Sequence, residues 1–187
     1  MDPEKSLTNQ ESLEIITKMI QTAKGNVKGN SFYFLLWGWV GALGNLGQYI
    51  IAEITDYPHP YMIWLIAIPA WIISFAYGYK KSKTAAVKTY GDYLVMWVWI
   101  SFLFSIIIVI FSGPFMELIP TVILIMAGMC LFITGCIIKF KPLIYGASTF
   151  WIFSALILML GSNYAPLLSA IAVFCGYLIP GYMLKRS

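Results

Sequence analysis

The chain has 187 residues, of which 60% are hydrophobic, 17% are aromatic and only 11% are charged. A water-soluble domain carries about 25% charged residues, so this composition excludes an ordinary soluble domain and indicates a protein embedded in a lipid bilayer. The net charge of +4 comes from twelve Lys and Arg residues whose positions follow the hydrophobic runs, which argues against nucleic acid as a partner.

Residues 8–28 predict an amphipathic helix outside the membrane. Thr8 followed by Glu11 forms a capping box, which is typical of a helix start. Apolar residues then recur at helical spacing on one side: Leu13, Ile16, Met19, Ile20, Ala23 and Val27. Four residues that disfavour helix are expected to loosen or end it: Gly25, Asn26, Gly29 and Asn30. Residues 1–30 therefore form a predicted cytoplasmic segment that lies on the membrane surface, docks under the bundle or binds a partner.

Residues 31–187 predict a six-span transmembrane domain. A helix needs about 20 apolar residues to cross the hydrocarbon core, and six runs meet this length. They lie near 31–53, 59–79, 91–112, 116–138, 142–161 and 164–184. The short connections leave no room for a folded domain outside the membrane. The predicted fold class is all-α, a polytopic membrane helix bundle with an additional amphipathic helix at the N-terminus.

The basic residues are distributed asymmetrically between the connections. Every Lys and Arg lies before the first span, between spans two and three, between spans four and five, or after span six. With six spans, all of these segments lie on one side of the membrane. The opposite side carries Glu53, Asp56 and Glu117. By the positive-inside rule, we expect both termini to be cytoplasmic.

The first span, 31–53, is the least lipid-like of the six. Glycine recurs every third residue, at Gly38, Gly41, Gly44 and Gly47, and therefore spirals around the helix. At about 100° per residue, one side combines Gly41, Asn45, Gln48 and Ala52, and Glu53 follows at its end. This candidate polar face either packs against another helix or lines a polar cavity.

Two further groups of residues are candidates for a special role. Glu53, Asp56 and Glu117, with His59, could gather at the outer rim, either as solvated interfacial residues or as a cation site. Pro69 and Pro180 lie inside or late in spans, where a missing N–H frees a carbonyl and favours a kinked or widened helix.

The sequence contains no recognisable catalytic constellation. His59 is the only histidine, and no metalloprotease, nucleophile-elbow or phosphate-loop motif is present. The three cysteines lie inside hydrophobic runs at spacings that suit no zinc site, and are interpreted as packing residues: Cys130, Cys136 and Cys175. We expect a protein that is not an enzyme and that has no cofactor and no metal centre.

A faint internal repeat suggests three helical hairpins of similar polarity. Aromatic pairs lie near the starts of spans one, three and five, and each even span ends in a glycine shortly before a lysine. Tryptophan near a membrane interface and lysine after a span are also general features of membrane proteins, so both explanations stay open.

Four stretches of the chain resemble a group of small six-span membrane proteins of Bacteroidota. They are residues 11–20, 35–39, 138–142 and 179–184. The resemblance implies a location in the inner membrane of a Gram-negative cell. It supplies no activity, cofactor or site residue.

Together these features favour a non-enzymatic inner-membrane protein that acts through protein–protein or protein–lipid interaction. The expected partners are membrane lipid and a membrane or cytoplasmic protein, which could be a second copy of the chain. The alternative is a small transporter or channel with a polar path along the first span.

Overall fold

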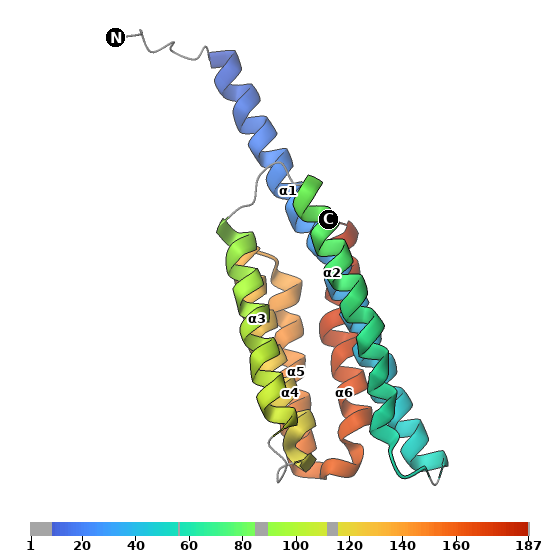
Figure 1. The fold of residues 1–187 in the computed structure, drawn as a ribbon. Coiled ribbons are helices and arrows are strands. Elements are labelled where there is room, and N and C mark those ends of the chain that lie inside the picture. The colour runs from blue at the N-terminus through green and yellow to red at the C-terminus, as the bar shows by residue number, and fades with distance from the viewer. Residues whose placement is uncertain (1–8, 56, 85–89, 112–115, 187) are drawn as a thin grey trace.

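The computed structural model describes residues 9–55, 57–84, 90–111 and 116–186, and the regular structure in these ranges is entirely helical (Figure 1). The elements in chain order are α1 (Asn9–Ile54), the 3₁₀ helix η1 (Pro60–Ile66), α2 (Ala67–Thr84), α3 (Tyr90–Ile110), the 3₁₀ turn η2 (Met116–Leu118), α4 (Ile119–Ile137), α5 (Lys141–Leu160), the 3₁₀ turn η3 (Ser162–Tyr164), α6 (Ala165–Val173), the π-helix η4 (Phe174–Leu178) and α7 (Ile179–Arg186).

Five segments of the described chain are long and apolar enough to cross a membrane: Pro60–Lys81, Tyr90–Ile110, Ile119–Ile137, Lys141–Leu160 and Ser162–Arg186. They run alternately up and down through the bundle (Figure 1). This arrangement is that of a multi-pass membrane protein, which confirms the predicted membrane helix bundle. The five segments agree with predicted spans two to six to within a few residues at each end.

Helix α1 joins two parts that the sequence analysis separated. It runs without interruption over 46 residues, from Asn9 to Ile54, so of the two expected outcomes at 25–30, a loosened helix or a helix end, the end does not occur. Isolated Gly and Asn residues cost at most about 1 kcal/mol each within a helix, and extending an existing helix needs no new nucleus. A long helix nucleated by the following stretch can therefore continue through them. The predicted cap residue Thr8 lies outside the described residues.

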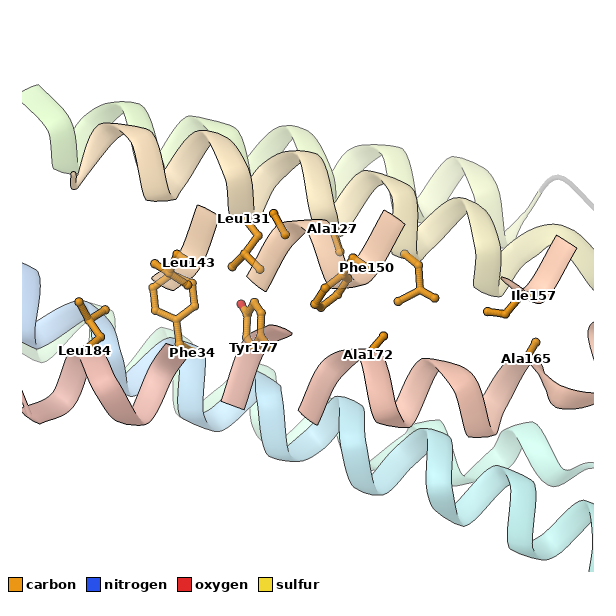
Figure 2. Close-up of a cluster of buried hydrophobic side chains, with 12 residues drawn as sticks. Phe34, Ala127, Leu131, Leu143, Phe150, Ile157, Ala165, Ala172, Tyr177 and Leu184 are labelled. Atoms are coloured by element: carbon orange, nitrogen blue, oxygen red, sulfur yellow. The ribbon is translucent and has the colours of Figure 1, made fainter. Parts of the chain in front are cut away.

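The core lies between α4 and α5 on one side and α1, α6, η4 and α7 on the other (Figure 2). The buried cluster consists of Phe34, Leu124, Ala127, Leu131, Leu143, Ala147, Phe150, Ile157, Ala165, Ala172, Tyr177 and Leu184. Figure 2 shows Ile157 above Ala165 at one end of this cluster and Leu143 above Phe34 toward the other. Close contacts at Gly128 and Gly135 bring α4 against α5, because a Cβ at either glycine would lie 2.8 Å from an α5 side chain.

Helix α3 and the η1–α2 segment lie at the periphery. Among their described residues α3 and η1 bury no side chain, and α2 buries only Ala70. Helix α3 packs mainly on α4, whereas η1 packs on α1. Large apolar side chains on the outer faces, such as Phe75 and Ile108, are 68% and 71% exposed. In a membrane protein such faces contact lipid tails.

Packing is not organised into three separate hairpins. The most extensive interface joins α4 and α5, which belong to different hairpins in the predicted repeat. The repeat itself stays a prediction.

Candidate functional site

The glycine spiral of α1 serves two neighbouring elements. Gly38 and Gly41 face the α6–η4 side of the bundle. A Cβ built at Gly38 would lie 2.7 Å from Leu178 Cδ2, and one at Gly41 would lie 3.3 Å from Val173 Cγ1. These two glycines therefore allow the backbone of α1 to approach the last span closely.

The next two glycines face η1 instead. A Cβ at Gly44 would lie 3.3 Å from the Trp64 ring, and one at Gly47 would lie 3.2 Å from Ile63 Cγ1. In the same interface between α1 and η1, Trp64 Nε1 donates a hydrogen bond of 2.7 Å to Gln48 Oε1. Gln48 thus contacts η1, whereas Gly41 contacts α6.

The predicted polar face therefore divides between neighbours. Asn45 Nδ2 donates to the Gly41 carbonyl oxygen of its own helix at 2.8 Å. Glu53 is exposed in the last turn of α1. Because the amides of Asn45 and Gln48 both have partners within the chain, helix packing is sufficient to account for this face.

Tryptophan N–H groups link α1 to two further helices. Trp37 Nε1 donates to Ser74 Oγ of α2 at 3.0 Å, and Trp39 Nε1 donates to Tyr182 OH of α7 at 3.0 Å. An indole has one donor and no acceptor, and within hydrocarbon it must find its acceptor on another protein group. Their sequence positions predicted only a place near a membrane interface and gave no sign of these hydrogen bonds between helices.

The outer-rim residues are not brought together as a metal site within the described residues, where no three His, Cys, Asp or Glu side chains form a ligand group. His59 instead contacts two tyrosines. Its Nδ1 lies 3.0 Å from Tyr61 OH, and its ring packs edge-on against Tyr57. Glu53 and Glu117 are exposed, and Asp56 lies outside the described residues.

Pro180 produces a widened turn in the last span. In η4 the N–H of Ile179 donates to the Phe174 carbonyl five residues earlier, which is the π-helical pattern. Pro180 has no N–H, so the Gly176 carbonyl lacks its α-helical donor. That carbonyl lies against Gly146 of α5, where an added Cβ would overlap it. The tightest crossing of the bundle is therefore located at the widened turn.

Pro69 lies in the first turn of α2, directly after a change of helix type. The segment before it, η1, is a 3₁₀ helix, and the N–H of Ala67 donates to the Trp64 carbonyl three residues earlier. The α-helix then begins at Ala67.

Tyr177 is a buried residue that contacts three other aromatic rings, and sequence reasoning did not single it out. Only 7% of the residue is exposed. Its ring centroid lies 5.2 Å from that of Phe34, 6.1 Å from that of Trp99 and 6.3 Å from that of Phe150. Residues of α1, α3 and α5 thus meet at one side chain of η4, so this cluster holds both sides of the bundle together.

Hydroxyl groups fall into two classes. Ser101, Ser105 and Ser154 donate to carbonyls of their own helices at 2.8–2.9 Å, as serines in spans commonly do. Thr121 Oγ1 and Ser169 Oγ are buried and have no hydrogen-bond partner within the described residues. These two are the polar groups of the core that packing does not explain.

No protein-family model, no curated protein and no solved structure matches this chain. The interpretation of each site therefore depends on its own geometry and chemistry.

Proposed function

We propose that this chain is a non-enzymatic protein of the inner (cytoplasmic) membrane that acts by binding a protein partner through the N-terminal part of α1. The observation that carries the proposal is the continuity of α1, which extends past the ends of the other helices in the direction of the N-terminus (Figure 1). We call residues 9–30 of this helix the α1 extension.

The α1 extension has the composition of a partner-binding helix. Its 22 residues rise about 33 Å at 1.5 Å per residue. Its sequence places apolar residues along one side and Glu14, Lys18 and Gln21 on the other. This helix continues the direction of the following span and leads away from the bundle (Figure 1). A helix with one apolar side can dock that side into an apolar groove of another protein.

The orientation of the protein supports a cytoplasmic partner. The described basic residues after α1 lie at the ends of α2, α4 and α7 and at the start of α5, on the side from which the α1 extension projects. The exposed Glu53 and Glu117 lie at the other end of the bundle, in the last turn of α1 and in η2 before α4. By the positive-inside rule, six spans with both termini in the cytoplasm satisfy this distribution, with residues 31–53 of α1 as the first span.

Truncation of residues 1–28 tests the proposal. The expected result is loss of a specific co-purifying protein or of a homo-oligomer in mild detergent, while the spans stay inserted. Substitution of Ile16 and Ile20 by Gln should have the same effect. Substitution of Glu14 and Gln21 by Ala, on the other side of the helix, is the matched control and should leave the complex intact. Unchanged complexes after truncation would contradict the proposal.

A small transporter or channel is the alternative function. The observation that favours it is the pair of buried hydroxyls without partners, Thr121 and Ser169, because polar groups enclosed in a membrane protein often contact water or substrate. In a background without native cysteines, Cys placed at Asn45 or Gln48 should then react with membrane-impermeant thiol reagents. Lack of reaction from both sides of the membrane would argue against a polar path.

A further inference from the structure

The turn between α4 and α5 is closed by three backbone hydrogen bonds. Ile138 N–H donates to the Thr134 carbonyl at 3.0 Å, Lys139 N–H to that of Cys136 at 3.2 Å, and Phe140 N–H to that of Gly135 at 2.9 Å. The last two bonds define a Schellman motif, in which the residue after the helix adopts a left-handed conformation.

That left-handed residue is Lys139, with φ of 55°. Glycine is the usual residue at this position because a Cβ is unfavourable there, and Lys139 is the non-glycine residue with positive φ among those described. A lysine at a position that favours glycine suggests that its charge has a role beyond forming the turn.

A second pair of cations lies at the same end of the bundle as this turn (Figure 1). Lys185 and Arg186 end α7, which packs against α5, and a Cβ at Gly146 would lie 3.0 Å from Pro180 Cγ of α7. Figure 2 shows the buried Leu143 and Leu184 toward the same end of the core. We call the four exposed cations at this end the α5–α7 basic patch: Lys139, Lys141, Lys185 and Arg186.

The charge of this patch is not compensated by nearby acids in the sequence. Residues 118–186 contain no Asp or Glu. The lysines at the end of α2 differ, because Lys81 interacts electrostatically with Asp92 and Lys83 Nζ lies 4.4 Å from the centre of the Tyr79 ring. The two basic regions on this side of the bundle thus have different local partners.

We propose that the α5–α7 basic patch binds the phosphate headgroups of anionic phospholipids in the cytoplasmic leaflet. The turn places only three residues between α4 and α5, so its lysines cannot extend far from the membrane surface. Fully buried leucines lie within one turn on the core side, at Leu143 and Leu184. Cations held at this depth are close to lipid phosphates, which favours a lipid over a soluble anion. The proposal rests on the orientation inferred above but does not involve the α1 extension.

Lipid binding can be measured by native mass spectrometry on full-length protein exchanged between phosphatidylglycerol and phosphatidylcholine. Each cation near an anionic membrane surface contributes about fivefold to binding. The wild-type protein should therefore prefer phosphatidylglycerol, and K139Q/K141Q and K185Q/R186Q should each lower that preference by about 25-fold. The matched control K80Q/K83Q removes the same charge from the end of α2 and should retain most of the preference.

The variant Lys139→Gly removes the charge of Lys139 without disturbing the fold of the turn. Glycine favours the left-handed turn, so this variant should be at least as thermally stable as the wild type while binding phosphatidylglycerol about fivefold less tightly. Equal preference of the wild type for both lipids would overturn the proposal, as would equal losses in K139Q/K141Q and K80Q/K83Q. Loss of lipid preference with an intact protein complex would leave the proposed function of the α1 extension standing.

Discussion

The α4–α7 region and the peripheral helices α2 and α3 differ in how they use hydrophobic residues. Between α5 and η4, backbone contacts backbone at Gly146 and Gly176 without space for a Cβ. Helix α3 is equally apolar, yet buries no side chain within the described residues. Lipid tails are as apolar as leucine, so hydropathy alone does not decide which helix is central. Small residues that allow close approach mark the central helices of this bundle.

The largest expected effect comes from adding a side chain at the tightest contact, between Gly146 and Gly176. Gly146→Val should prevent α5 from packing on η4, because the added side chain would overlap the Gly176 carbonyl and backbone cannot move aside as a flexible side chain can. We expect loss of the folded monodisperse protein in size-exclusion chromatography. Gly47→Ala is the control, since its Cβ would meet only the Ile63 side chain, and it should remain folded.

Truncating a central side chain should cost more than truncating a peripheral one. Leu131 is fully buried, so Leu131→Ala is expected to lower the free energy of unfolding by about 2–5 kcal/mol. Ile108 on α3 is 71% exposed, and Ile108→Ala should change the free energy of unfolding by less than about 0.5 kcal/mol. Thermal or denaturant unfolding in one detergent measures both. Similar losses would show that α3 is covered by another protein surface.

Lys139→Gly should stabilise the central region. A left-handed conformation costs a residue with a Cβ about 1 kcal/mol, which glycine avoids. The unfolding temperature should rise relative to the wild type in detergent without anionic lipid. A fall would mean that the Lys139 side chain makes a stabilising contact with the protein itself.

A small effect is expected from the hydrogen bond between Trp64 and Gln48, which joins peripheral η1 to α1. Interhelical hydrogen bonds of this kind contribute about 0.6 kcal/mol on average. A double-mutant cycle with Trp64→Phe and Gln48→Leu should give a coupling energy of about that size. A coupling energy near zero would show that the bond does not hold η1 in place.

The sequence predicted the membrane helices well because span length depends on bilayer thickness, which every helix must match. It also predicted that the glycines of α1 spiral around the helix. It could not show that Gly41 contacts α6 while Gln48 contacts η1, since the rotation of each helix depends on all of its neighbours. The helix does not end at 25–30, one of the two expected outcomes, because local propensity is weak compared with continuation of a long helix. The cluster around Tyr177 joins residues far apart in the chain and leaves no local pattern.

Because α1 is continuous, it connects the bundle rigidly to its own N-terminal end. A continuous helix of 46 residues transmits any tilt of the part that packs in the bundle directly to its N-terminal end. With about 33 Å of helix beyond residue 30, a tilt of about 10° would displace that end by about 6 Å. Movements in the bundle and events at the N-terminal end of α1 are thereby mechanically connected, in either direction.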